Sequence, residues 1–313
     1  MNNAPTTEDR IWAVISHLSS LAFGMGILLP IIGWSDQRRK SNYASFQCLQ
    51  ALGYQSLGFT VWVLLCLLAM IPLLLSLIGV PGLMGDGTAN SDSLIGIWAA
   101  VFSIVTFGLF GLYFLLPIIA AVACGLGRDF RYPIMGNRLA RYLRYDPAHT
   151  VDESAWLMDK HEDRWVAAMG HFSVIIALWG MLAPLAALLL HGQRNFFLKF
   201  QSIQALAFQA GTTLIYFGAG LVYSFGIFLL AATMGLTGEP NFDSPLAMLG
   251  IIIFFVSLLI ALVIIMLIPL LHILGQWAGY RVLKGDDYRY PVIGKLVERR
   301  LAQAGSQTLI EPE

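Results

Sequence analysis

Glutamine and histidine are the residues of this sequence that could do chemistry inside an otherwise apolar chain. FQCLQALGYQ begins at Phe46, and FQSIQALAFQ begins at Phe200. In each stretch the glutamines stand three and five residues apart, within one broad face of a helix. They could hydrogen-bond between helices and fix the packing of an interface, or line a groove that faces water or a translocated segment. These candidates are Gln47, Gln50, Gln55, Gln201, Gln204 and Gln209.

His17 and His171 lie about two turns into apolar segments, and His272 lies deeper in the last one. An ionisable group at membrane depth is a candidate for proton transfer. A neutral histidine can instead bond a carbonyl or a neighbouring helix. No other charged residue falls within a predicted span, so a proton relay would have few members. His17 and His171 therefore join the candidate interface or lining residues.

The composition predicts an all-α integral membrane protein. Apolar residues make up 57% and charged residues 12% of the chain, and the mean hydropathy is +0.70. In soluble proteins, apolar residues make up about half of the chain and charged residues about a quarter. The apolar runs are continuous rather than alternating, which excludes a β-barrel. The N-terminus has no basic stretch before its first apolar run, so no cleavable signal peptide is expected.

The chain repeats itself. EDRIWAVISHLSSLAFGMGILLP from Glu8 matches EDRWVAAMGHFSVIIALWGMLAP from Glu162, and GRDFRYPIMG from Gly127 matches GDDYRYPVIG from Gly285. We expect a first membrane module at 1–144, a polar linker at 145–161, and a second module at 162–313 with a basic amphipathic tail. Each module holds three apolar segments, at 11–34, 46–80 and about 94–124, and at about 165–190, 200–234 and 246–280.

The basic residues favour a particular topology. If all six segments cross, the 19 Lys and Arg residues divide nine to ten between the two faces. If the first segment of each module dips in and returns, all 19 lie on one face, as the positive-inside rule prefers. The opposite loops, PGLMGDGTANSDS and GLTGEPNFDS, carry only acidic charges. Breakers for such a turn are present: Gly24, Gly26, Pro30, Gly180 and Pro184. A single kinked crossing is the alternative.

The RYP elements flank the long spans. Tyr132 and Tyr290 are predicted to anchor at the headgroup level while Arg131 and Arg289 reach phosphates, as membrane-surface anchors or as specific lipid-headgroup contacts. The basic amphipathic stretches NRLARYLRY and GKLVERRLAQA are expected to lie on the membrane surface.

The sequence has no P-loop, HExxH or GxSxG motif, so we expect no enzyme, no catalytic residue and no cofactor. Cys48, Cys66 and Cys124 have no CxxC spacing and are interpreted as buried apolar residues rather than metal ligands. Nucleic-acid binding is not expected, because topology explains the basic residues. The expected partners are membrane lipid and other membrane proteins or a second copy.

EDRIWAVISHLS followed by Pro, the element FQ-x-[LI]-QA and then RYP resemble a bacterial membrane-protein family. That family is related to the twenty-kilodalton component of the chloroplast inner-envelope translocon (Tic-twenty-like). Phe46, Gln50 and Ala51 stand at its Phe-x-x-Met-Gln-Ala element, with Leu49 in place of Met. The resemblance implies four-crossing modules with both termini on one side and a role in protein transport. This chain departs from the pattern by its short first segment and its duplication.

We therefore expect an inner-membrane (plasma-membrane) protein with both termini cytoplasmic, in a translocon-related or membrane-complex scaffold role. The glutamine faces are expected to pack at the interface between the two modules. One alternative is a small-solute or ion transporter with inverted repeats. The other is an accessory subunit of a larger membrane complex.

Overall fold

The computed structural model describes residues 4–77, 88–146, 157–236 and 244–307. Helices make up its regular structure and no strand occurs in these ranges, which confirms the all-α prediction. The chain packs as two compact units, Met1–Ser202 and Ile203–Glu313. Most of the predicted linker and of the two acidic loops lies outside the described residues. Six helical segments are long and apolar enough to cross a membrane: Thr7–Gln37, Asn42–Leu75, Ile95–Gly125, Asp159–His191, Phe196–Gly235 and Pro245–Lys284.

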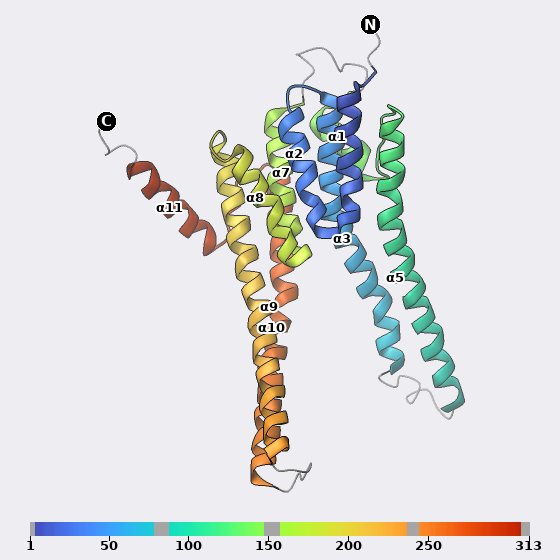
Figure 1. Cartoon of the computed structure of the whole chain (residues 1–313), viewed down its shortest axis with the longest axis vertical. Helices are drawn as coiled ribbons and strands as arrows, with labels where there is room; N and C mark the ends of the chain where they lie inside the picture. The colour runs from blue at the N-terminus through green and yellow to red at the C-terminus, as the bar shows by residue number, and fades with distance from the viewer. Residues whose placement is uncertain (1–3, 78–87, 147–156, 237–243, 308–313) are drawn as a thin grey trace. The chain divides into compact units, whose positions relative to one another are not determined.

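The first of these segments is a hairpin. Helix α1 (Thr7–Leu18) leads through the 3₁₀ segment η1 (Ser19–Ile27) into α2 (Leu28–Gln37), and α1 and α2 lie side by side (Figure 1). The amide of Gln37, in the last turn of α2, donates to Oε1 of Glu8, in the first turn of α1, at 3.0 Å. Thr6 caps α1 by accepting from the backbone N–H of Asp9 at 3.2 Å. The chain therefore enters and returns at the same level, as the charge distribution predicted.

The reversal of the first hairpin lies at Phe23, whose φ is +53° and ψ is −139°. A non-glycine residue in this region is strained by about 1–3 kcal/mol. Gly26 is required for close approach, since a Cβ there would stand 1.8 Å from the carbonyl oxygen of Ser19. Pro30 falls in the first turn of the returning helix, where its missing N–H costs nothing. Of the predicted breakers, Gly26 and Pro30 thus support the turn without forming its reversal point.

The second hairpin repeats this design. It consists of α7 (Asp159–Phe172), η4 (Ser173–Met181) and α8 (Leu182–His191). Its reversal is at Ala177, with φ +50° and ψ −130°, the residue that corresponds to Phe23 at the repeat spacing. A Cβ at Gly170 would stand 3.4 Å from Cβ of Pro184, so the outgoing and returning helices touch. The first segment of each module is therefore re-entrant in the structure.

The long helices of the first unit exceed the thickness of a membrane. Helix α3 (Asn42–Leu77) has 36 residues and is about 54 Å long, whereas a hydrocarbon core is about 30 Å thick. Its residues 42–53 are all buried, whereas its later part exposes Val61, Leu64 and Leu68 by more than half. Helix α5 (Thr88–Gly125) runs beside α3 and also extends past the hairpin (Figure 1). The glutamines of α3 thus lie in the surplus length, enclosed by protein, and the exposed apolar part has the length of one crossing.

The described part of the second unit contains α9 (Phe196–Leu236) from Ile203 onward, α10 (Pro245–Lys284) and α11 (Ile293–Gln307). Close contacts between α9 and α10 are made possible by glycine. A Cβ at Gly226 would meet the Ser257 side chain at 2.7 Å, and one at Gly250 would meet Thr233 at 2.0 Å. Small residues at such crossings let membrane helices pack backbone to backbone.

Candidate functional site

His17 is the centre of a buried hydrogen-bond network in the first module. The ring is 0% exposed, with Nδ1 3.0 Å from the Tyr132 hydroxyl and Nε2 3.0 Å from Oε1 of Gln47. The Gln47 amide nitrogen donates to Oδ1 of Asp129 and to the carbonyl of Phe130, both at 3.0 Å. Oε1 of Gln47 is therefore an acceptor, and a neutral His17 with its proton on Nε2 satisfies every bond. Burial raises the pKa of Tyr132 well above its usual value, which keeps its hydroxyl a donor.

Gln50 holds the RYP loop through the loop's backbone. Its amide nitrogen donates to the carbonyl of Phe130 at 3.0 Å, and its Oε1 accepts from the N–H of Tyr132 at 2.9 Å. One side-chain amide thus pairs with both backbone groups of a short stretch, as a neighbouring strand would do. Gln47 and Gln50 also bond each other at 3.1 Å. The RYP loop is fixed to α3 by these two residues.

The second module repeats these contacts. Within the first unit, Nε2 of His171 lies 3.0 Å from Oε1 of Gln201. Within the second unit, the amide of Gln204 donates to the carbonyl of Tyr288 at 2.7 Å and accepts from the N–H of Tyr290 at 3.3 Å. Phe208 stacks on Tyr290 with ring centroids 4.2 Å apart. The repeat therefore preserves the His–Gln bond and the bonds of the second glutamine to the loop backbone.

These hydrogen bonds lie within modules, which differs from the expectation that the glutamine faces join the two modules. Gln47 and Gln50 contact α1 and the RYP loop of their own module, and Gln204 contacts the loop that follows α10. The sequence reasoning missed this arrangement because the RYP loop is about 80 residues away from each glutamine stretch. The signal was nevertheless present, since both elements recur at nearly the same spacing.

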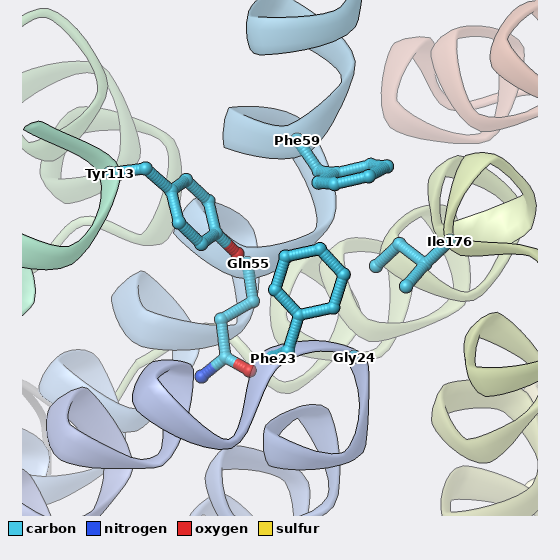
Figure 2. A pocket seen from close by; sticks show the side chains of 6 residues that line it. All are labelled: Phe23, Gly24, Gln55, Phe59, Tyr113 and Ile176. Carbon is cyan, nitrogen blue, oxygen red and sulfur yellow. The ribbon is translucent and has the colours of Figure 1, made fainter. Parts of the chain in front are cut away.

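Gln55 lies at the tip of the first hairpin. Its amide nitrogen donates to the Ser19 hydroxyl at 2.9 Å, and its side chain lines a crevice with Phe23, Gly24 and Ile176 (Figure 2). The aromatic rings of Phe59 and Tyr113 close this crevice, which has no room for a water molecule. The protein is therefore close-packed around the Gln55 side chain, which does not line an open polar groove.

The two hairpins lie side by side and point the same way. At their tips, a Cβ on Gly24 would stand 2.6 Å from Cβ of Trp179. At their bases, the rings of Trp34 and His191 have centroids 4.7 Å apart. The tip of one hairpin meets the tip of the other, and the base meets the base. Both hairpins therefore begin and end at the same end of the first unit.

A buried ionic cluster joins the bases of the hairpins. Arg38, whose side chain is 13% exposed, lies 3.3 Å from Asp159, 3.0 Å from Glu162 and 2.7 Å from Asp163. Burial lowers the pKa of Arg38, but the carboxylates, Asp163 first, raise it more, and the net shift is above its usual value. Trp165 of α7 adds a hydrogen bond from its indole N–H to the carbonyl of Leu49 at 2.9 Å. From the sequence, Arg38 was counted only among the basic residues that indicate topology. Its role in the cluster could not be predicted, because its carboxylate partners lie more than 120 residues away.

Among the predicted membrane-surface anchors, the two tyrosines are buried and the two arginines form ion pairs. Tyr132 and Tyr290 are 3% and 2% exposed, so both side chains are packed inside protein, and their position at the headgroup level stays a prediction. Arg131 pairs with Asp129 at 3.1 Å, and Arg289 pairs with Asp287 and Glu298. The stretch NRLARYLRY forms α6 (Met135–Leu143), whose apolar face packs against α3 and α7 instead of lying on lipid.

Cys48 and Cys124 are buried as expected, and Cys66 is half-buried. In the part of the chain that the structure describes, no three His, Cys, Asp or Glu residues are grouped so that they could hold a metal ion. His272 of α10 bonds the hydroxyl of Tyr216 of α9.

The fold and its networks define an integral, multi-pass α-helical membrane protein built from two copies of one module, each with a re-entrant hairpin. The model of the magnetosome magnetite crystal formation protein family (MamF/MmsF) matches the chain twice, at residues 8–139 and 162–297. The chain belongs to this family. The resemblance to the Tic-twenty-like family was therefore wrong, and the expectation of a role in protein transport, which followed from it, has no support. No curated protein and no solved structure matches the chain.

Proposed function

We propose that this chain is a non-catalytic scaffold of the magnetosome membrane and contributes to magnetite crystal formation by holding two hairpins in a fixed pair. The observation that carries the proposal is the double family match, one for each module, on a chain whose paired hairpins are joined by a buried ionic cluster. Buried charge pairs cost free energy and fix one arrangement when they form. A cluster of this kind is expected in a protein whose role is to keep two structural elements in one fixed arrangement.

The polar residues of the hairpin region support a structural role rather than chemistry. His17 is bonded through both ring nitrogens, and Gln47 and Gln50 are each bonded to the RYP loop. Groups held in this way do not need to change protonation or partner. We infer that the chain carries out no covalent step.

The orientation follows from charge. The hairpin bases lie at the same end as Arg38 and Arg39, and we infer that this end and both termini face the cytoplasm. Cysteines placed singly at Ser41 and Asn195, in a chain otherwise free of cysteine, should both resist an impermeant maleimide until the membrane is opened. Labelling of either cysteine by the maleimide in intact cells would contradict this orientation.

The function is tested by gene deletion in a magnetite-forming host, followed by complementation. We expect altered crystal size or shape in the deletion strain, rescue by the wild type and by Arg39→Gln, and poor rescue by Arg38→Gln. The tagged chain should fractionate with the crystal-bearing membrane. Crystals unchanged by deletion would refute a role in crystal formation.

A transporter with inverted repeats is the competing function. It would need the two hairpins to enter from opposite faces, whereas their tips meet and their bases meet. Iron uptake into proteoliposomes is the measurement that separates the two. Uptake faster with the purified chain than with lipid alone would refute the scaffold.

A further inference from the structure

Three arginines line one open groove beside α6. Arg131, Arg141 and Arg144 enclose about 620 Å³ together with Asn137, Ala140 and Tyr145. The helix turns its apolar side to the protein, with Leu139 and Leu143 at 1% and 0% exposed, so its arginines lie on the open side. The volume falls in the range of small-ligand sites.

The positive charge of this groove is only partly neutralised. Arg131 is held by Asp129 at 3.1 Å and by Oδ1 of Asn137 at 3.1 Å. Asp129 already accepts from Gln47 and from Tyr145, so its charge is shared. Arg141 makes one long bond, 3.4 Å, to a backbone carbonyl, and Arg144 has no ion pair among the described residues. Within the described residues, two guanidinium groups are therefore left without a counter-charge.

The backbone conformation of Arg144 supports a specific role for this arginine. Arg144 ends α6 in the left-handed conformation, with φ +58° and ψ +35°. Glycine or asparagine usually occupies such a position, and a long side chain there is strained. The chain thus places an arginine at the rim of the groove where glycine would cost less free energy.

The second module provides an internal comparison. At the repeat spacing of 158 residues, Ala140 corresponds to Glu298 and Arg144 corresponds to Ala302. Glu298 pairs with Arg289, the counterpart of Arg131, at 2.7 Å. In the second module an acidic residue therefore neutralises the arginine, and the rim arginine is missing. The second module has Lys295 and Arg300 at the positions of Asn137 and Tyr142, so the specific difference is the acidic partner of the Arg131 counterpart and the missing counterpart of Arg144.

We propose that this groove binds a phosphate group carrying about two negative charges. Guanidinium groups bind phosphate oxygens in paired hydrogen bonds, and a phosphate monoester carries about −1.5 to −2 charge at neutral pH. The phosphate can come from the headgroup of an anionic lipid such as phosphatidic acid or from a free phosphate. Both sources have the same chemistry at the arginines.

The test uses the full chain in detergent. Binding of phosphatidic acid, phosphatidylglycerol and phosphatidylcholine is measured by native mass spectrometry, and binding of inorganic phosphate by thermal stabilisation. The variants are Arg141→Gln with Arg144→Gln, and Ala140→Glu, which copies the second module. The matched control is Arg299→Gln, because Arg299 is the counterpart of Arg141.

We expect the wild type and Arg299→Gln to bind phosphatidic acid more tightly than phosphatidylcholine. The double arginine variant and Ala140→Glu should each bind it at least about tenfold more weakly. Inorganic phosphate that binds with the same dependence on the variants would identify free phosphate as the source. The proposal is overturned if no phosphate compound binds, or if Arg299→Gln weakens binding as much as the double variant. Exposed Arg141 and Arg144 lie outside the packed core, so their variant should fold.

Discussion

Replacing Arg38 by glutamine should separate the two hairpins at their bases. Arg38 is the cation shared by three carboxylates, and two of them, Glu162 and Asp163, belong to side chains only 2% and 10% exposed. Removing one partner of a buried pair costs about 3–5 kcal/mol, because the remaining charge is left uncompensated. The 13% exposure of Arg38 lets some water in, and glutamine can keep one hydrogen bond. We therefore expect a loss of about 3 kcal/mol in the free energy of unfolding.

The neighbouring Arg39 is the matched control. Among the residues that the structure describes it pairs only with Asp159, and the two side chains are 71% and 44% exposed. An exposed pair contributes about 0–1 kcal/mol, so Arg39→Gln should change stability by less than about 1 kcal/mol. Both variants remove one positive charge from the same loop, and they differ in burial.

The assay is unfolding of the full chain by titration with a denaturing detergent. It is followed by the fluorescence of tryptophan, since Trp34 and Trp179 lie between the hairpins and Trp165 lies between the second hairpin and α3. The loss in Arg38→Gln should shrink at acidic pH, where protonated carboxyl groups no longer repel one another. Adding Glu162→Gln and Asp163→Asn to Arg38→Met should recover most of the stability, because no unpaired charge remains. Equal effects of Arg38→Gln and Arg39→Gln would refute the reasoning.

Three further predictions concern the hairpins. His17→Phe should lower the free energy of unfolding by about 1–3 kcal/mol, since it leaves the Tyr132 hydroxyl without its partner and Gln47 Oε1 with the Gln50 amide in place of two donors; the same detergent titration measures it, and an unchanged midpoint would contradict the network. Ala177→Gly should raise stability by about 1 kcal/mol, because glycine adopts φ +50° without strain; a loss in the same titration would show that Ala177 is not strained. Cysteines at Gly24 and Trp179, in a chain otherwise free of cysteine, should form an intramolecular disulfide seen as a gel shift, once the tips move about 1 Å apart to reach the Cβ–Cβ distance of about 3.5–4.5 Å that a disulfide needs. A pair at Gly24 and His191 should not form one, and the reverse result would disprove that the tips meet.

The sequence was sufficient to predict the membrane class, the repeat and the re-entrant first segments. Each depends on composition, spacing or the count of Lys and Arg, which act along the chain without reference to distant contacts. The position of the reversal was harder. Glycines and prolines suggested Gly24 or Pro30, but the turn lies at Phe23 and Ala177, because contacts around the tip hold a strained residue in place.

The hydrogen-bond partners could not be read from the sequence. Gln50 pairs with the backbone of Phe130 and Tyr132, and backbone groups leave no signature in side-chain pattern. The same limit applies to Tyr132, which reads as an interfacial anchor by residue type. In the structure its hydroxyl bonds His17, so the residue is buried instead. The partners become visible once the loop is folded back onto α3.

Fusion of the two modules into one chain explains why the ionic cluster has a single arginine. Helices α2 and α8 are equivalent elements that pack against each other, as they would in a symmetric pair of identical modules. In such a pair, a second arginine equivalent to Arg38 would stand at the same base. At the repeat spacing of 154 residues its place is taken by Gly192, and Glu8 and Asp9 are the counterparts of Glu162 and Asp163. Glu8 bonds Gln37 instead of an arginine. Two modules in one chain can diverge in this way, and the buried charges then form one asymmetric cluster rather than two facing like charges.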